Sequence, residues 1–252
     1  MTFWEHLNEL RSRVIKSAIA VLIGFGVAWV FKAELLEILA QPYIEGARAA
    51  GLAKGSDAVP LHNPGPTNLF VAYIKICLLG GTLAALPIVL YQVWAFIAPG
   101  LYKKEKRFAI PFVLVSCGLF VGGATFGARV VFPLAFAFFL KLGVGEEGST
   151  LAVQNTMMID QYLEFVLRAL VAFGAVFEIP VVIFFLSVAG LINHTHLIKF
   201  FRYFVVIAFI LSAVITPPDV ISQLLLAGPL ILLYSISIGI ARVFGRKVAA
   251  PV

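Results

Sequence analysis

The chain has 252 residues, of which 61% are hydrophobic and only 13% are charged, and its formal net charge is +6. Soluble domains average about 45–50% apolar and about 25% charged residues, so a water-soluble globule of this length is excluded. The surplus of cations does not indicate nucleic-acid binding, because the lysines and arginines stand mainly at the ends of apolar runs, where they orient membrane helices.

Six apolar runs follow one another along the chain. Each is near the length of about 20 residues that a helix needs to cross the hydrocarbon core of a bilayer. We therefore predict an all-α integral membrane protein with six transmembrane helices, forming a single domain over residues 1–252. The predicted helices cover residues 14–40, 68–97, 108–140, 161–189, 197–215 and 220–243.

The first residues predict a short amphipathic helix that lies in the membrane interface and leads into the first span. Thr2 and Glu5 have the spacing of a capping box, and Leu7 and Leu10 begin an apolar stripe at helical spacing. Pro42 is predicted to end the first transmembrane helix.

The second span contains Pro87, which predicts a kink in the helix. It ends in a turn at Pro99 and Gly100, and a cluster of four cations follows within a few residues. Glu105 is the single carboxylate inside that cluster. Such a pattern is typical of a membrane helix that leaves the bilayer on its positively charged side and re-enters.

The last two helices are predicted to be short. The apolar part of helix five, Tyr203 to Ile215, covers about 13 residues, or about 20 Å of helix. Pro217 and Pro218 form a tight turn before helix six, and Asp219 is suited to cap it. A helix of this length predicts local thinning of the membrane.

Orientation follows from the cations. Twelve of the 19 lysines and arginines fall on one side of a six-helix arrangement, and this side is predicted to be cytoplasmic, with both termini inside. These twelve are Arg11, Arg13, Lys16, Lys103, Lys104, Lys106, Arg107, Lys199, Arg202, Arg242, Arg246 and Lys247.

Three carboxylates need an explanation. Glu178 stands in an apolar run before Pro180, where a charged group costs about 2.5–3.5 kcal/mol on insertion scales. It is either a protonated group hydrogen-bonded inside the bundle or a docking or proton-linked site, with Gln223 as a companion. For Glu9 the alternative to a functional role is an ion pair with Arg13 one helical turn away. For Glu105 the alternative is that it only relieves charge repulsion among the neighbouring cations.

No enzyme motif is present. The chain has no HExxH, GxSxG or Walker sequence, and its histidines and two cysteines have no metal-ligand spacing. We therefore expect no catalytic residue, metal or cofactor. The remaining classes are a small-solute transporter, a channel and a membrane receptor that handles proteins.

Several motifs resemble those of one family, in the same order along nearly the whole chain. They are HLNELRSR at 6–13, Gln41-Pro42, LPIVLYQVWAFIAPGLY at 86–102 followed by Glu105, VFPLAF at 131–136, FEIP at 177–180 and TPPDV at 216–220 with Ser222-Gln223. The chain resembles the TatC family, the multispanning core of the twin-arginine protein translocase.

The resemblance implies a function. TatC-like proteins recognise twin-arginine signal peptides on proteins that are exported folded. It implies that Glu9 and Glu105 bind the two arginines, that Arg11 orients the glutamate site, and that Phe96 holds the apolar part of the signal. Planar guanidinium groups match carboxylates with two parallel hydrogen bonds.

The resemblance also implies partners and a location. Glu178 and Gln223 would dock single-span TatA-like and TatB-like subunits in an oligomeric complex of the bacterial inner membrane, driven by the proton-motive force. A proton-coupled small-solute transporter that uses Glu178 remains the alternative.

Overall fold

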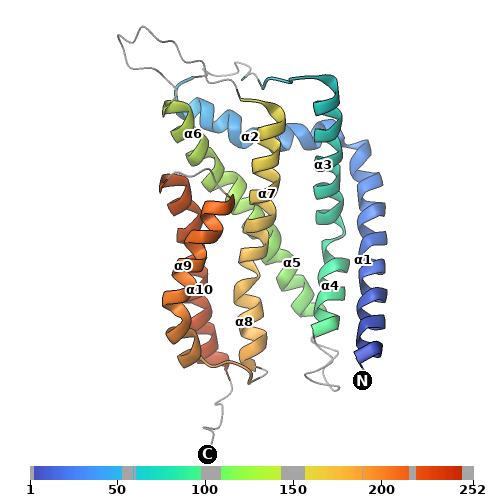
Figure 1. The fold of residues 1–252 in the computed structure, drawn as a ribbon, viewed down its shortest axis with the longest axis vertical. Coiled ribbons are helices and arrows are strands. Elements are labelled where there is room, and N and C mark those ends of the chain that lie inside the picture. Colours follow the sequence, from blue (N-terminus) through green and yellow to red (C-terminus); the bar gives the residue numbers. More distant parts are fainter. Residues whose placement is uncertain are drawn as a thin grey trace, which may run out of the picture. The chain divides into compact units, whose positions relative to one another are not determined.

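A computed structural model describes residues 3–52, 59, 61–97, 109–142, 157–188, 190–215 and 220–245. Within these ranges the chain is built from helices, and an isolated bridge between His62 and Met158 is the only β-type pairing (Figure 1). Six helices are long and apolar enough to cross a membrane. The predicted all-α fold with six candidate transmembrane segments is therefore confirmed.

The helices belong to two compact units. The first contains Met1–Gln41, Leu61–Val121 and Met157–Leu167, and the second contains Pro42–Pro60, Gly122–Thr156 and Arg168–Val252. Each unit therefore combines segments that lie far apart in the sequence.

In the first unit, α1 (Phe3–Val30) packs against α3 (Pro66–Ala84) and α4 (Leu86–Ile97). The contact between α1 and α3 is closest at two glycines. A Cβ built on Gly81 would lie 2.4 Å from the backbone nitrogen of Phe25, so only a glycine allows this approach. The predicted interfacial segment and the first span form one continuous helix, because α1 has no break near residue 14.

The first span ends earlier than predicted. α1 stops at Val30, and α2 (Lys32–Ala49) follows after a turn at Phe31 and runs in a different direction (Figure 1). Part of the stretch between the first two predicted helices, which end at residue 40 and begin at residue 68, is therefore helical.

The prediction that Pro42 ends a helix is wrong, because Pro42 lies inside α2. A proline there removes one backbone hydrogen bond, which is normally costly. Packing offsets this cost. Pro42 and Tyr43 are buried, the ring of Tyr43 meets that of Phe136 edge-on at 5.9 Å, and a Cβ on Gly46 would lie 2.7 Å from the Cβ of Phe136.

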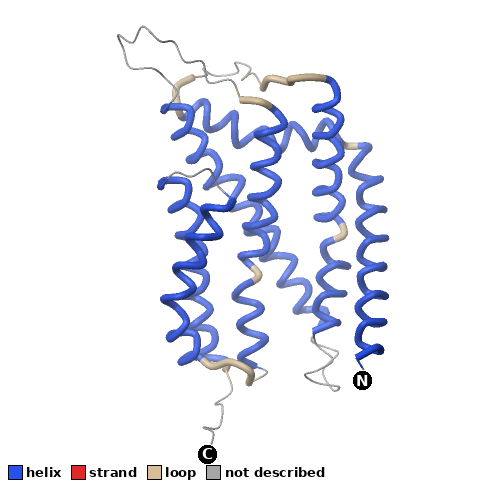
Figure 2. The backbone as a smooth tube through the Cα atoms, viewed as in Figure 1, coloured by secondary structure: helices blue, strands red, loops and turns tan. Residues whose placement is uncertain are grey.

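Two of the spans are interrupted two residues before a proline. Ala85 separates α3 from α4 ahead of Pro87, and Glu178 separates α7 (Ile159–Phe177) from α8 (Ile179–Val188) ahead of Pro180. Figure 2 shows both interruptions as short tan segments. Proline has no N–H for the carbonyl four residues earlier. At the first break, the N–H of Ala85 still donates to the carbonyl of Gly81 at 2.9 Å, and the N–H groups of Ile88 and Val89 both donate to the carbonyl of Ala85.

A third proline is preceded by a π-helical turn. The turn η3 (Gly127–Val131) joins α5 (Ala109–Phe126) to α6 (Phe132–Leu142), and the N–H of Phe132 donates to the carbonyl of Gly127. Because Pro133 cannot donate to the carbonyl of Arg129, the wider turn changes the bonding pattern just before it.

The glycine pairs of this span differ in their packing. A Cβ on Gly123 would lie 2.6 Å from the backbone oxygen of Phe173, and a Cβ on Gly127 would lie 2.7 Å from the Phe173 ring. A Cβ on Gly118 or Gly122 would meet nothing within 4 Å. In the described part of this span, the glycines at which a Cβ would clash with α7 are therefore Gly123 and Gly127.

Helices five and six are longer than predicted. α9 (His194–Ile215) has 22 residues and α10 (Val220–Phe244) has 25, so each extends over 30 Å or more at about 1.5 Å per residue. The prediction that helix five is short is wrong because α9 begins at His194, before its apolar part. The prediction that helix six is short is wrong because α10 has 25 residues, close to the range of 220–243 expected for it. The side chain of Asn193 caps it by accepting a hydrogen bond of 2.9 Å from the N–H of His196.

Candidate functional site

Glu9 and Arg13 form an ion pair one helical turn apart on α1. The Nη2 and Nε atoms of Arg13 lie 2.5 Å and 3.1 Å from the same oxygen of Glu9, Oε1. The side chains are 21% exposed for Arg13 and 22% for Glu9, so the pair is partly shielded from solvent. A glutamate placed four residues before its cation is the favourable orientation for a helical pair.

The neighbouring helix α4 completes this site. The Nη1 atom of Arg13 donates to the Oε1 atom of Gln92 at 3.4 Å. The ring of His6 stacks on that of Phe96, with centroids 4.5 Å apart and an interplanar angle of 22°. We call Glu9, Arg13, Gln92, His6 and Phe96 the α1–α4 site. It combines a carboxylate, a guanidinium and an apolar ring surface.

Trp94 holds this end of α4 in place. Its side chain is buried, its Nε1 atom donates to the Oγ atom of Ser116 at 3.0 Å, and its ring meets Phe112 edge-on at 4.5 Å. Both partners belong to α5. The hydrogen bond satisfies two polar atoms that would otherwise be costly to bury. Gln92 and Phe96 therefore project from a fixed helix.

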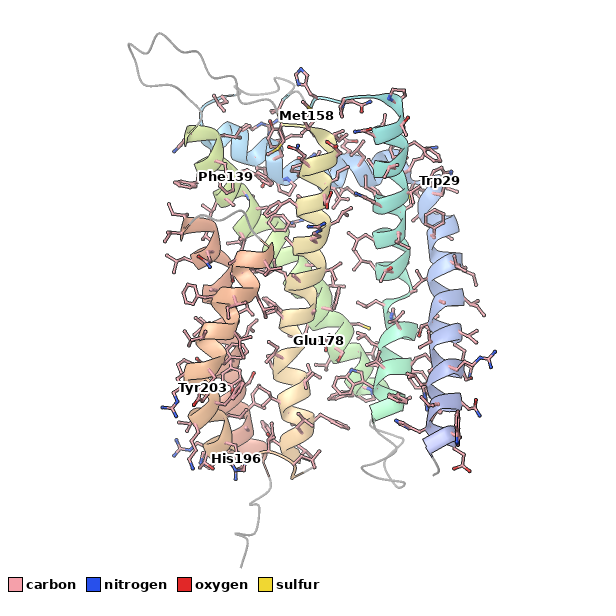
Figure 3. All side chains as sticks on the ribbon, viewed as in Figure 1. Trp29, Phe139, Met158, Glu178, His196 and Tyr203 are labelled. Carbon is pink, nitrogen blue, oxygen red and sulfur yellow. The ribbon has the colours of Figure 1, made fainter. Side chains whose placement is uncertain are left out.

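Glu178 lies at the junction of α7 and α8 (Figure 3), and its Oε1 atom is buried. About 15 Å of helix separates it from the end of α8 at Val188. In the same unit, the Nε2 atom of Gln223 on α10 donates to the carbonyl of Phe209 on α9 at 3.0 Å and links these two helices. Glu178 and Gln223, the two residues predicted to dock partner subunits, thus lie on different helices.

A second polar cluster links α3 to the first turns of α7. The Nζ atom of Lys75 lies 3.7 Å from the Oε2 atom of Glu164, and the Nδ2 atom of Asn68 donates to the Oδ2 atom of Asp160 at 3.3 Å. Lys75 therefore has an acidic neighbour within the bundle. Among the residues that the structure describes, no three His, Cys, Asp or Glu side chains are grouped to hold a metal ion.

The sequence matches a known family over most of its length. Residues 5–229 match the family described as Sec-independent protein translocase protein (TatC). The chain belongs to the TatC family. A Sec-independent protein translocase protein TatC from Desulforapulum autotrophicum is 42% identical, with 97% of this chain and 86% of that protein covered. The TatC of Aquifex aeolicus is 43% identical, with 98% and 97% covered.

Solved TatC structures have the same fold. A crystal structure titled as the twin arginine translocase receptor TatC has a TM-score of 0.81 and 44% identity, and covers 96% of this chain and 100% of that one. A second, in the detergent DDM, has a TM-score of 0.80 and 43% identity, with 94% and 99% covered. These similarities support a multi-pass membrane protein of a protein translocase, and they do not favour the small-molecule transporter.

The structure describes only some of the residues that were predicted to have a functional or structural role. Glu9 and Phe96 lie in the α1–α4 site, whereas Arg11 is exposed, and Arg13 is the arginine that contacts Glu9 in the described part of the chain. Several predicted residues lie outside the described ranges. They are Pro99, Glu105, Pro217, Pro218 and Asp219.

Sequence reasoning missed three contributors to the α1–α4 site. Gln92 is the only strongly polar side chain in the apolar stretch from 86 to 97, and this isolation could have identified it. His6 lies three residues before Glu9 and therefore on the same face of α1, off the apolar stripe of Leu7 and Leu10. Arg13 was considered as a helical partner for Glu9 and not as part of a site.

Proposed function

We propose that this chain is the receptor for twin-arginine signal peptides and the core of a Sec-independent translocase that exports folded proteins. The observation that carries the proposal is the α1–α4 site in a chain of the TatC family. A partly shielded carboxylate there lies close to aromatic surface, and a relative with the same fold is titled as a twin-arginine translocase receptor.

The chemistry of the site suits a cationic peptide with an apolar segment. Guanidinium is planar and presents a fixed fork of donors, which a carboxylate accepts through parallel hydrogen bonds. Glu9 and Glu105 take the two arginines of the signal. Phe96, which is half-buried, contributes to the surface for its apolar part, because an aromatic ring packs well against aliphatic side chains. Arg11 orients the carboxylates from outside the pair.

The rest of the chain serves assembly. TatA-like and TatB-like single-span subunits dock at Glu178 and Gln223, and the assembly acts as an oligomer in the bacterial inner membrane. Both termini lie in the cytoplasm, the proton-motive force drives transport, and residues 1–252 act as one functional domain without a cofactor. A carboxylate at membrane depth is a strong docking point, because hydrogen bonds replace its lost hydration.

The receptor function is tested by peptide binding. The purified chain in lipid nanodiscs is titrated with a fluorescent peptide that carries two consecutive arginines before an apolar segment, and with the same peptide carrying two lysines. We expect the twin-arginine peptide to bind at least about tenfold more tightly, since one bidentate pairing is worth on the order of 1.4 kcal/mol more than a point contact. Equal affinities would contradict a site that recognises guanidinium.

A substitution at Glu178 separates docking from recognition. We expect Glu178→Gln to leave the affinity for the twin-arginine peptide unchanged and to reduce co-purification of the single-span subunits several-fold. The amide keeps the shape of the side chain and removes its charge. The matched control is Glu164→Gln, a carboxylate within α7. Loss of peptide binding in the Glu178 variant would show that the two sites are not separate.

A further inference from the structure

The carboxylate proposed to receive a signal arginine is already occupied by an arginine of the same chain. Arg13 donates to Glu9 through Nε and Nη2. We propose that Arg13 is a built-in competitor for Glu9, which an arginine of the signal peptide must displace, and that this competition lowers the affinity of the site for every cationic ligand. The inference rests on the proposed function, because it takes Glu9 as the receptor carboxylate.

The geometry of the pair leaves room for a stronger partner. Both donors of Arg13 converge on Oε1 of Glu9, and in the described part of the chain neither reaches Oε2. The strongest arrangement of a guanidinium and a carboxylate is the parallel one, with one hydrogen bond to each oxygen. A peptide arginine approaches freely and can adopt it, whereas Arg13 reaches Glu9 along the surface of its own helix. The incoming group therefore has the better geometry.

Gln92 can accept a hydrogen bond from the displaced Arg13 side chain. The Nη1 atom of Arg13 is already 3.4 Å from the Oε1 atom of Gln92 on α4. When Glu9 pairs with the peptide, a small movement of Arg13 toward α4 shortens this contact and keeps its charge hydrogen-bonded. A displaced cation without an acceptor would weaken peptide binding, because an unsatisfied, partly buried charge is costly.

This competition lowers the affinity of every cationic ligand of Glu9. Any ligand of Glu9 must bind it better than Arg13 does. Another guanidinium can achieve this through the parallel arrangement, but an ammonium group is a point charge without a planar fork. The competitor therefore raises the dissociation constants of both peptides by the same factor, and the difference between them comes from the direct contact of each head group with Glu9. The simpler alternative is that Arg13 only positions Glu9, in which case removing Arg13 would weaken binding.

The two explanations predict opposite signs. Binding of the twin-arginine and twin-lysine peptides is measured for the full chain in nanodiscs, with Arg13→Gln, Gln92→Leu and the double variant. We expect Arg13→Gln to bind the twin-arginine peptide about three- to tenfold more tightly and the twin-lysine peptide more tightly by a similar factor, because both displace the same competitor. Gln92→Leu should weaken twin-arginine binding about threefold in the native background and have no effect when Arg13 is absent.

Controls separate competition from charge and folding. Lys16→Gln removes a cation from the next turn of α1 and should change affinity less than twofold. Arg13→Lys keeps the charge and should give an intermediate gain, so the test survives if Arg13→Gln does not fold. Weaker or unchanged binding in folded Arg13 variants, with Glu9→Gln losing binding, would overturn the competitor alone. Unchanged binding in Glu9→Gln would overturn the receptor site as well.

Discussion

Replacing Glu9 by glutamine should lower the affinity for a twin-arginine peptide by about 30-fold or more. Removing one member of a partly buried, hydrogen-bonded charge pair costs on the order of 2 kcal/mol or more, and each 1.4 kcal/mol is a tenfold change in affinity. The Glu9 side chain is 22% exposed, so solvent screens its interactions only in part. The measurement is a fluorescence titration of the full chain in nanodiscs.

Glu5→Gln is the matched control, because it removes the same charge from the same helix one turn away. We expect it to change the affinity less than about threefold, the effect of a single solvent-screened charge. An equal loss in both variants would mean that the site reads net negative charge and not the geometry at Glu9. Thermal unfolding of both proteins should show that neither substitution separates α1 from α4.

The six membrane spans could be predicted from sequence because lipid imposes a simple rule. Each span needs about 20 apolar residues, and the backbone must satisfy its own hydrogen bonds, so the length of an apolar run is nearly sufficient information. The starts predicted at residues 68 and 161 illustrate this, since they lie within two residues of the observed starts at Pro66 and Ile159. The presence of each membrane span and its helical structure therefore follow from local composition.

Helix ends depend on contacts that composition does not contain. Pro42 looks like a terminator, but buried neighbours and a close approach to Phe136 keep α2 helical through it. Pro229 lies inside α10 in the same way. By contrast, Pro87 and Pro180 do interrupt helices. The local steric cost of a proline in a helix is the same at all four positions, and tertiary packing decides which helices continue through the proline.

The site was only partly predictable for a similar reason. Glu9 and Arg13 are four residues apart, which brings them together on one helix face, whereas Glu9 and Arg11 are two apart and point away from each other. Spacing alone thus favours Arg13. The contributions of Gln92 and His6 depend on how α4 lies against α1, a tertiary arrangement that no single stretch of sequence encodes.

Gly81→Ala is expected to destabilise the protein by about 1–3 kcal/mol, although alanine is the better helix former. The added Cβ would lie 2.4 Å from the nitrogen of Phe25 and 2.8 Å from the carbonyl carbon of Gly24. These are backbone atoms of α1, so no side-chain rotation relieves the clash and the helices must separate. Thermal unfolding in detergent, followed by tryptophan fluorescence, measures the change.

Gly26→Ala is the control that decides the mechanism. It lies on the same helix pair, but its Cβ would meet nothing within 4 Å, so alanine should be neutral or stabilise the protein by up to about 1 kcal/mol. The Gly81 variant should also bind the twin-arginine peptide less tightly, even though Gly24 lies about 22 Å along α1 from Glu9. Separation of α1 from α3 moves Glu9 relative to Gln92 and Phe96, which α4 holds. Equal stability losses in both glycine variants would mean that helix separation is not the cause.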